Sequence, residues 1–336
     1  MRIAVDAMGG DAGPGVIVEG ALDALRNGSG DLEVVLVGNE KTLRNEISAR
    51  NGGSLPISLI HAEDVISMSD APTEALRRKP TSSIAVGLSL HREGKAQAFV
   101  STGNTGAVVA NALISLGRLR TVRRPAIATY LPTEAEGCVL LDVGANATAK
   151  PQHLVEFAEM GTVYARHILH RVNPRVGLLN IGEEESKGSE IIQEAHQLLK
   201  ASPLNFVGNV EGRGIFHGDV DVVVCDGFVG NVLLKFVESV FGMVKSSVKK
   251  RIARDPRVQL GALLMKPVFN DLRERLNYEE YGGAPLLGVN GVCIICHGSS
   301  SSVAIKNAIR VAGEFVRNGL NEKIDEQITG DQKASR

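Results

Sequence analysis

The chain has 336 residues, with 37 Lys and Arg against 38 Asp and Glu, which gives a formal net charge of −1. A nearly neutral chain has no overall field to attract nucleic acid, and one without Trp and with 4% aromatic residues offers few platforms for stacking bases. We therefore expect no nucleic-acid partner.

The length is sufficient for a large core in one α/β domain or in two lobes. The first residues, MRIAVDAMGG, lack the basic segment and long apolar core of a signal peptide. Two stretches without charge, residues 96–117 and 281–305, have about the length of a membrane span but are broken by Ser, Thr, Asn and Gly. We expect a cytoplasmic protein.

Eight short runs rich in Leu or β-branched residues each end in a turn of Gly, Asn, Ser, Thr or Asp. Such runs are typical of strands in a parallel sheet that is covered on both faces. They begin at Ile3, Glu33, Ala98, Cys138, Val176, Asn205, Asp221 and Val292.

Helical patterns separate these strands, and an alternation of strand and helix implies crossover connections. The helical patterns cover residues 17–26, 41–50, 83–93, 105–117, 151–171, 189–200, 231–251 and 303–318. The sequence predicts a three-layer α/β/α fold with a mostly parallel sheet, in a single α/β domain over residues 1–320. Residues 321–336 are polar, and we expect this tail to fray.

Residues 245–283 break the alternation, because they contain no strand pattern. Two apolar stripes flank Pro267, which predicts two short amphipathic helices that meet there and project from the sheet. The stripes consist of Leu260, Leu263 and Leu264, and of Phe269, Leu272 and Leu276. Basic residues around the stripes keep two interpretations open: packing in the core or between subunits, or a surface for a partner helix, an acyl chain or a lipid interface.

The clearest candidate site is the turn Ser101-Thr102-Gly103-Asn104-Thr105-Gly106, which follows a strand and opens a helix. Its N–H groups should lie at the positive end of the helix dipole, a position that favours phosphate. An ordinary helix cap needs only one Ser, Thr or Asn, whereas this stretch has four around two glycines. We therefore predict an anion site here.

Other strand ends carry residues of similar chemistry. The carboxyl ends of parallel strands meet at one edge of a sheet, so we expect these turns to share one rim with the anion site. The candidates are Gly9, Gly10 and Asp11; Asp142 and Asn146; Lys187; Asp226, Gly227, Gly230 and Asn231; and His297. Taken singly, most are ordinary turn or cap residues. Lys187 could reach an anion in the cleft, and His297 is the candidate general acid, general base or oxyanion donor.

Signatures of cofactors are missing or weak in the sequence, and we expect no cofactor and no metal. No GxGxxG motif is followed by an acidic residue at the next strand end. Asp221 and Asp226 lie on the order of 16 Å apart along a strand, too far to share a metal ion. In the CIIC run at 293–296 the side chains alternate between the faces of a strand, so we expect buried, reduced thiols.

Six of the turns occur in an order that resembles one family. The opening IAVDAMGGD, then STGNTGA, LLDVGAN, IGEEESKG, DGFVGN and HGSSS are similar to the bacterial phosphate:acyl-ACP acyltransferase (PlsX) family of phospholipid synthesis. The match runs from Arg2 to about Val316. Residues 261–276 and the tail match by pattern only.

The resemblance implies an α/β/α fold like that of isopropylmalate dehydrogenases and phosphotransacetylases, in a homodimer. It implies the transfer of a long fatty acyl group from acyl carrier protein to inorganic phosphate, which gives acyl phosphate and the free carrier. The product would serve a glycerol-3-phosphate acyltransferase at the membrane. The helical projection would contribute to dimer contact and to association with the inner face of the cell membrane.

This reaction suits the residues in the turns. Phosphate is already an oxyanion nucleophile and a thiol leaves easily, so the protein needs to hold two reactants and to stabilise a tetrahedral oxyanion. We expect residues 101–106 to hold phosphate, Lys187 and Asn231 to neutralise developing charge, and His297 to donate a hydrogen bond. The residues expected to organise the pocket are Asp142, Asn146 and Asp226.

Acyl carrier proteins are acidic, and two basic groups of residues could bind one. One group is Arg118, Arg120, Arg123 and Arg124; the other is Lys245, Lys249, Lys250, Arg251, Arg254 and Arg257. Three alternatives remain: a metal- and NAD-dependent β-decarboxylating dehydrogenase, an acetyl-CoA phosphotransferase, and a non-catalytic phosphate- or lipid-binding module. Hydride transfer, turnover of short acyl-CoA, or binding without turnover would reveal each of them.

Overall fold

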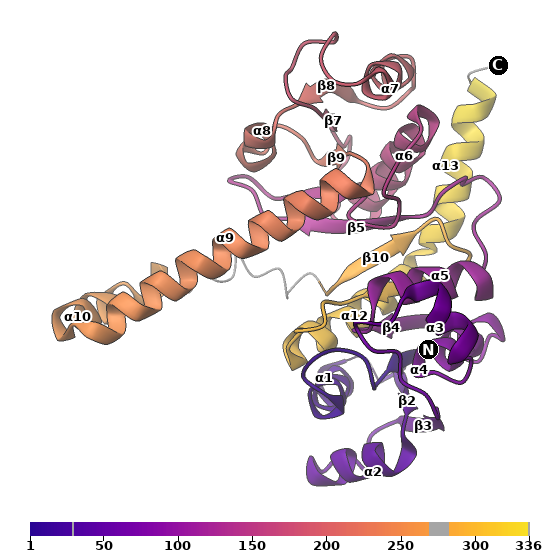
Figure 1. The fold of residues 1–336 in the computed structure, drawn as a ribbon, viewed down its shortest axis with the longest axis vertical. Coiled ribbons are helices and arrows are strands. Elements are labelled where there is room, and N and C mark those ends of the chain that lie inside the picture. The colour runs from indigo at the N-terminus through magenta and orange to yellow at the C-terminus, as the bar shows by residue number, and fades with distance from the viewer. Residues whose placement is uncertain (29, 269–281, 335–336) are drawn as a thin grey trace.

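The computed structural model describes residues 1–28, 30–268 and 282–334. The eleven strands among these residues form one sheet in the order β3-β2-β1-β4-β11-β10-β5-β6-β9-β7-β8, with helices packed around it (Figure 1). The strands are β1 (Arg2–Asp6), β2 (Glu33–Gly38), β3 (Ile57–His61), β4 (Ala98–Ser101), β5 (Ala126–Leu131), β6 (Cys138–Leu141), β7 (Val176–Leu179), β8 (Phe206–Val210), β9 (Val222–Val224), β10 (Ala284–Leu287) and β11 (Cys293–Ile295). All eight predicted strands are confirmed.

The predicted helices are also confirmed, each with its ends displaced by at most a few residues. The described helices are α1 (Pro14–Asn27), α2 (Glu40–Ala49), α3 (Pro72–Arg78), α4 (Ser83–Arg92), α5 (Thr105–Ser115), α6 (Pro151–His167), α7 (Glu190–Lys200), α8 (Gly212–His217), α9 (Gly227–Arg254), α10 (Pro256–Leu264), α12 (Ser302–Asn318) and α13 (Leu320–Ala334). Side-chain caps begin several of them; Asn39, for example, accepts the Thr42 N–H at 3.0 Å.

Three strands were not predicted, and two of them reverse the direction of the sheet. β10 pairs antiparallel with both β11 and β5, and β5 pairs antiparallel with β6. The remaining pairs are parallel, so β1 to β5 and β11 run one way whereas β6 to β10 run the other. The mostly parallel sheet is confirmed, but its parallel strands end at two opposite edges.

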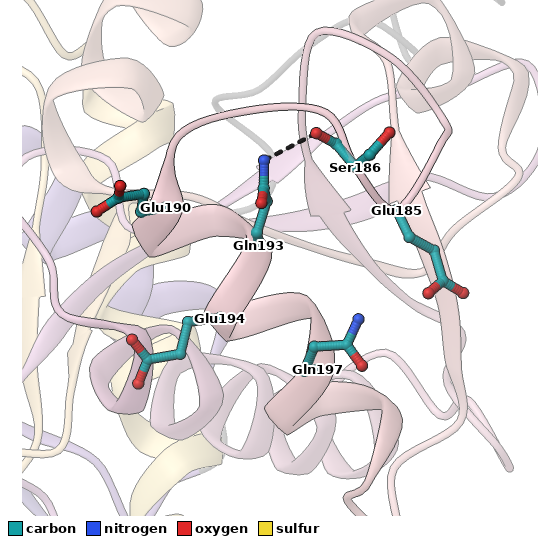
Figure 2. A pocket seen from close by; sticks show the side chains of 6 residues that line it. All are labelled: Glu185, Ser186, Glu190, Gln193, Glu194 and Gln197. Atoms are coloured by element: carbon teal, nitrogen blue, oxygen red, sulfur yellow. Dashed lines mark hydrogen bonds between the residues drawn. The ribbon is translucent and has the colours of Figure 1, made fainter.

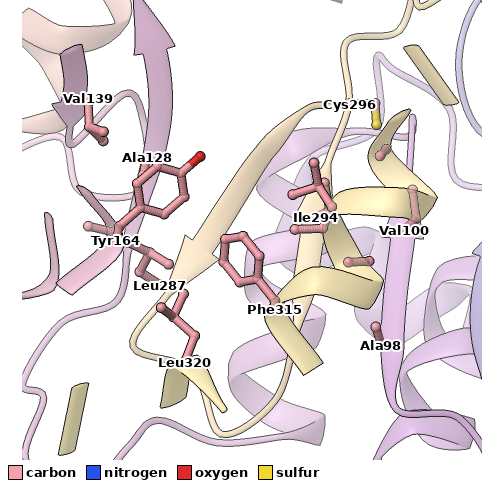
Figure 3. Close-up of a cluster of buried hydrophobic side chains, with 14 of the residues drawn as sticks. Ala98, Val100, Ala128, Val139, Tyr164, Leu287, Ile294, Cys296, Phe315 and Leu320 are labelled. Carbon is pink, nitrogen blue, oxygen red and sulfur yellow. The ribbon is translucent and has the colours of Figure 1, made fainter. Parts of the chain in front are cut away.

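A continuous apolar cluster crosses the point where the strand direction changes. Figure 3 shows Val100 and Ile294 from one half of the sheet and Val139 from the other. Tyr164 of α6 and Phe315 of α12 meet between them, with ring centroids 5.7 Å apart. Burial of apolar surface, at about 25 cal/mol per Å², therefore holds the two halves of the sheet together.

Residues 321–334 do not fray as predicted, because they belong to α13. Leu320, Ile324 and Ile328 recur every fourth residue and are buried in the main cluster, where α13 packs against α6. The Asp325 carboxylate also accepts a hydrogen bond from Thr121. Three apolar residues at helical spacing thus dock this segment, and the Asn321 amide adds hydrogen bonds to the carbonyl groups of Val289 and Gly291.

The helical projection begins earlier than predicted. α9 starts at Gly227 beside the sheet and continues for 28 residues to Arg254, and α10 folds back beside its far end (Figure 1). The chain turns at Asp255, whose side chain caps the Arg257 N–H, and not first at Pro267 as predicted. The three leucines of the first stripe, Leu260, Leu263 and Leu264, are exposed. The second stripe, Phe269, Leu272 and Leu276, lies outside the described residues.

Candidate active site

The turns after β1, β4 and β11 lie together, and we call them the first turn cluster (residues 6–11, 101–106 and 297–301). Its organiser is Asp6, a buried carboxylate that sequence reasoning missed. Its Oδ1 accepts the N–H groups of Met8 and Gly9 at 3.1 and 3.2 Å, and its Oδ2 accepts the Ser101 hydroxyl at 2.7 Å. Ser101 Oγ in turn accepts the Gly103 N–H at 2.9 Å. The sequence feature that could have revealed Asp6 is an aspartate at the end of an otherwise apolar buried strand.

The main chains of the turns after β1, β4 and β11 are in close contact. A Cβ on Gly9 would lie 2.6 Å from the Gly103 nitrogen, and one on Gly10 would lie 2.8 Å from the Gly298 carbonyl oxygen. The Gly10 φ of +82° also favours glycine. The Asp11 N–H donates to the Gly298 carbonyl at 2.7 Å. The predicted proximity of these three turns is therefore confirmed.

The polar side chains of the anion motif have different tasks. Asn104 caps α5 by accepting the Ala107 N–H at 3.0 Å, and its amide donates to backbone carbonyls of residues 67, 68 and 70. Its side chain is thus fully engaged by the fold. Thr102 Oγ1 is one of three buried side-chain polar atoms among the described residues without a hydrogen-bond partner. The Thr102 hydroxyl and the first N–H groups of α5 at Thr105 and Gly106 are the available donors.

His297 follows β11 and is exposed at the surface of the first turn cluster. Its Nδ1 accepts the Ser299 N–H at 3.2 Å and lies 2.7 Å from the Ser299 hydroxyl. A neutral imidazole whose Nδ1 accepts carries its proton on Nε2. The network therefore presents His297 Nε2–H as a hydrogen-bond donor.

The turns after β6, β9 and β7 form a second turn cluster (residues 142–146, 226–231 and 180–188). Its organiser is the fully buried Asp142. The carboxylate accepts N–H groups from Ile127, Gly144, Ala145 and Asn146 at 2.7 to 3.2 Å. Burial raises the pKa of Asp142, while these donors stabilise its anion. The Asn146 amide donates to Asp142 and to the backbone before β5, so it too is engaged by the fold.

The start of α9 packs tightly against the Asp142 turn. Asp226 caps the helix by accepting the Val229 N–H at 2.8 Å. A Cβ on Gly227 would lie 2.6 Å from the Asn146 carbonyl oxygen, and one on Gly230 would lie 1.8 Å from the Asp142 carbonyl oxygen. Asn231 comes next and is exposed, with its Cγ 3.7 Å from the position of a Cβ on Gly144. The Asn231 amide therefore does not cap a helix or hold a turn, as Asp226 and Asn146 do.

Lys187 lies in the turn that follows β7. Its side chain is 48% exposed, and its Nζ lies 3.9 Å from a Glu184 carboxylate oxygen, beyond hydrogen-bond distance. β7 pairs parallel with β9, and β9 with β6. The Lys187 turn therefore lies at the same sheet edge as the Asp142 and Asp226 turns.

The prediction that all six turns share one rim of the sheet is wrong for a single chain. The first turn cluster follows β1, β4 and β11, and the second follows β6, β7 and β9, which run in the opposite direction. The reversal comes from β10 and β5 in the middle of the sheet, which the sequence patterns did not reveal. Each predicted catalytic or phosphate-binding residue lies in one of two clusters of three turns.

Known proteins decide the family of this chain. A family described as "Fatty acid synthesis protein" matches residues 1–323. The phosphate acyltransferase of Heliobacterium modesticaldum is 50% identical over 331 residues, which are 98% of each chain. That of Geobacter sulfurreducens is 48% identical over 328 residues, 98% of this chain and 94% of the relative. This chain belongs to the phosphate acyltransferase family. It is a transferase, and the resemblance seen in the sequence is confirmed.

Solved structures agree on the fold of this acyltransferase. A phosphotransacetylase from Streptococcus pyogenes superimposes with a TM-score of 0.61 at 18% identity, covering 94% of both chains. The EutD phosphotransacetylase from Staphylococcus aureus gives a TM-score of 0.58 at 17% identity, again over 94% of both chains. Identities this low show the fold alone. The predicted phosphotransacetylase-like α/β/α architecture is confirmed.

The cysteines of this acyltransferase are buried, as predicted. All four cysteines are free and buried. Burial raises the pKa of Cys293 and of Cys296 to about 12, so neither is a thiolate near neutral pH. Among the described residues, no group of three or more His, Cys, Asp or Glu side chains is arranged to hold a metal ion.

One surface hollow, of about 510 Å³, lies beside the Lys187 turn (Figure 2). It is lined by Glu185, Ser186, Glu190, Gln193, Glu194 and Gln197. Three carboxylates make this hollow unsuitable for phosphate, because like charges repel in so short a space.

Proposed function

We propose that this chain transfers a fatty acyl group from acyl carrier protein to inorganic phosphate and so supplies acyl phosphate for phospholipid synthesis. The observation that carries this proposal is the 50% identity with a phosphate acyltransferase over 98% of both chains. The site chemistry supports it, because the described turns offer backbone N–H groups, a hydroxyl, an amide and an ammonium for anionic oxygens.

The reaction itself sets few demands on the protein. A phosphate oxygen attacks the thioester carbonyl carbon, the carbonyl oxygen becomes an oxyanion, and the C–S bond then breaks to release the carrier thiolate, which takes up a proton. Phosphate needs no activating base near neutral pH, and a thiol with a pKa near 8.5 is a good leaving group. Placement of the two reactants and stabilisation of the oxyanion remain for the protein to supply.

The first turn cluster is the proposed phosphate site. The Thr102 hydroxyl and the N–H groups that open α5 are its donors, and His297 Nε2–H lies on its exposed side. Gly9, Gly10 and Asp11 let the three turns approach closely. The positive end of the α5 dipole adds a further preference for an anion.

The second turn cluster is the proposed oxyanion site. Lys187 and Asn231 are two exposed polar groups of this cluster, and both are suited to neutralising charge on the tetrahedral intermediate. Asp142 and Asp226 fix the backbone from which Asn231 projects. Asn146 ties the same turn to β5, so these three residues organise the pocket and Lys187 and Asn231 contact the substrate.

A homodimer is proposed from the exposed apolar stripe of α9. Phe228, Val232 and Phe236 recur every fourth residue and are 55 to 66% exposed, which is unusual for large apolar side chains. Met243 continues the stripe toward α10. A second copy of the chain packed on this stripe would bury it, and that copy would then lie directly beside Asn231. The first turn cluster of one copy would meet the second turn cluster of the other.

The far end of the projection is proposed as a peripheral membrane contact. α9 is long and apolar enough to cross a membrane by length and composition, since an 18-residue window within it has a mean hydropathy of 1.4, but charged residues recur along the helix. Exposed Leu260, Leu263 and Leu264 on α10, near the basic end of α9, suit the surface of an anionic bilayer. A cytoplasmic enzyme held there could pass acyl phosphate to a membrane-bound glycerol-3-phosphate acyltransferase.

The basic residues of α9 are the proposed docking site for the acidic carrier protein. In the other basic group, Arg123 forms an ion pair with the buried Glu156 at 2.6 Å and Arg118 donates to the Val122 carbonyl. Lys245, Lys249 and Lys250 are exposed. Free, exposed cations steer an acidic partner better than cations engaged in the fold, and their effect should weaken with salt.

The deciding experiment incubates the purified chain with acyl-ACP and phosphate and traps acyl phosphate as its hydroxamate. Formation of the hydroxamate that depends on both reactants supports the proposal. Turnover of acetyl-CoA with no turnover of acyl-ACP would replace it with acetyl phosphate chemistry. Binding of phosphate or liposomes with no product at all would reduce the chain to a binding module.

A further inference from the structure

The turn that carries Lys187 is held by side-chain amides from three separate elements. Asn180, at the end of β7, donates to the carbonyl oxygen of Lys187 itself at 3.0 Å. Asn209 of β8 donates to the Glu184 carbonyl at 2.8 Å. Gln193 of α7 donates to the carbonyls of Ser186 and Gly188 at 2.8 and 3.2 Å, and the first of these bonds is drawn in Figure 2. We call Asn180, Gln193 and Asn209 the amide clamp.

The amide clamp acts on the backbone of the turn and leaves the lysine side chain alone. Side chains that lie outside residues 184–188 fix four carbonyl groups of this segment. Among the described residues, the one carboxylate within 4 Å of the Lys187 ammonium is that of Glu184, at 3.9 Å. A solvent-exposed turn does not need such bonds for stability, because water satisfies exposed carbonyls. The arrangement fixes the backbone position of Lys187 and leaves its ammonium group available to a substrate.

Asn209 is itself oriented by a buried partner. His196 Nδ1 lies 3.0 Å from Asn209 Oδ1, and both residues are buried. Since an amide oxygen only accepts, His196 carries its proton on Nδ1, and the Asn209 NH₂ group must then face the Glu184 carbonyl. The His196 ring is fixed edge-on against Phe206, with centroids 5.1 Å apart. The clamp is therefore anchored in the hydrophobic layer beneath α7.

We propose that Asn180, Gln193 and Asn209 are positioning residues of acyl transfer, which hold Lys187 in the place where its ammonium meets the developing oxyanion. This inference rests on the proposed function and on the proposed role of Lys187. The clamp residues do not contact substrate. They act through the backbone of the Lys187 turn, so their effect requires the lysine.

The test removes clamp donors with substitutions that keep the side-chain shape. Gln193→Glu and Asn180→Asp each replace an NH₂ donor with a carboxylate oxygen. That oxygen repels the backbone carbonyl oxygen to which the amide had donated a hydrogen bond. We expect kcat with acyl-ACP and phosphate to fall by roughly 10-fold to 100-fold, as small displacements of a positioned group do, with KM for acyl-ACP little changed. Hydrogen exchange of the amides in residues 182–188 should become faster in both variants.

The matched control is Gln197→Glu, one turn further along α7. It adds the same negative charge to the same hollow and repels the exposed Glu185 side chain, which keeps its ion pair with Lys200, but it contacts no backbone carbonyl of the turn. We expect kcat and hydrogen exchange of the turn to match the wild type. A loss equal to that of Gln193→Glu would assign the effect to added charge and overturn the clamp.

A double-mutant cycle separates the clamp from the role of the lysine. In a Lys187→Ala background, Gln193→Glu and Asn180→Asp should cause no further loss, because the group they position is gone. Equal losses in both backgrounds would mean that the amides act on the fold alone. If Lys187→Ala retains full turnover, the proposed role of the lysine fails. If Lys187→Ala is impaired while the clamp variants retain wild-type kcat, the clamp fails and the lysine stands.

Discussion

The first and second turn clusters are built on the same device and use it differently. In both, a buried aspartate ends a strand, Asp6 after β1 and Asp142 after β6, and its carboxylate collects N–H groups of the turn that follows. In the first cluster the turns close on one another through Gly9 and Gly10. In the second, exposed Lys187 and Asn231 project from a fixed backbone.

This difference separates residues that build a site from residues that face it. Ser101, Asn104 and Asn146 resemble ligand-binding side chains in the sequence, yet the fold engages all three. The side chains of Thr102, Lys187 and Asn231 have polar groups that the fold does not engage in hydrogen bonds. Buried polar groups are normally satisfied, so an unsatisfied hydroxyl or an exposed ammonium beside a satisfied turn is the more informative observation.

The largest effect should come from the buried aspartate with more donors. Asp142→Asn removes an anion that accepts four backbone N–H groups in a fully buried position, and we expect a loss of about 3–5 kcal/mol in the free energy of unfolding. Asp6→Asn, with fewer backbone donors, should cost less. Urea unfolding of both variants measures the order, and equal losses would mean that the two carboxylates are equivalent.

Substitutions of Lys187 and Thr102 should affect different kinetic constants, kcat for the lysine and KM for phosphate for the threonine. Lys187→Ala removes charge from the oxyanion site, and we expect kcat to fall by about 100-fold or more with a smaller change in KM for phosphate. Thr102→Val removes a hydroxyl from the phosphate site, and we expect KM for phosphate to rise by about 10-fold with kcat within a few-fold of wild type. Steady-state kinetics with varied phosphate measures both, and the reverse pattern would exchange the two sites.

Tight packing in the second cluster can be tested with glycines of one helix. Gly230→Ala places a Cβ 1.8 Å from the Asp142 carbonyl oxygen, and we expect a loss of about 2–3 kcal/mol in the free energy of unfolding. Gly242→Ala lies on the same helix with no atom within 4 Å, and helix propensity should stabilise it by up to about 1 kcal/mol. Chemical denaturation compares them. A tolerated Gly230→Ala would contradict the packing of α9 against the Asp142 turn.

The two clusters should work together only across a dimer. A heterodimer with Thr102→Val in one copy and Lys187→Ala in the other, purified through two different tags, contains one site with both wild-type groups. At phosphate well below KM we expect roughly half of the wild-type turnover, since one of two equivalent sites is intact. Turnover at the mean of the two single variants would place both clusters of one site in the same chain.

A smaller effect concerns pH and the half of the sheet that bears the first cluster. His91 Nε2 accepts the Val292 N–H at 2.8 Å beside β11, and burial lowers the pKa of His91. The unfolded chain then binds more protons than the folded chain as pH falls below about 6.5, so the free energy of unfolding decreases from there toward the lowered pKa. Urea unfolding between pH 7.5 and 5.5 should show a shallower dependence for His91→Gln. An unchanged slope would exclude His91.

The predicted assembly of the site was wrong for a single chain, and the roles of its residues remain predictions. The turns after β1, β4 and β11 could be grouped from sequence because each is a polar, glycine-rich end to a buried run. The same pattern marks the turns after β6, β7 and β9, but an apolar run of Val and Leu does not indicate in which direction its strand runs in the sheet. Asp6 and the amide clamp were missed because one aspartate at a strand end, or one asparagine in a strand, is an ordinary residue until its partners are known.

The sequence by itself determined the alternation of strands and helices, the polar turns that end the buried strands, and through six motifs in order the acyltransferase family. These depend on local patterns of apolar residues and turn chemistry, which are written along the chain. Only the tertiary structure decided that β10 and β5 reverse the sheet, that α9 leaves its body as an exposed helix, and that α13 docks. Those outcomes depend on pairing between distant strands and on which apolar face finds a partner, and neither is encoded within a single local window.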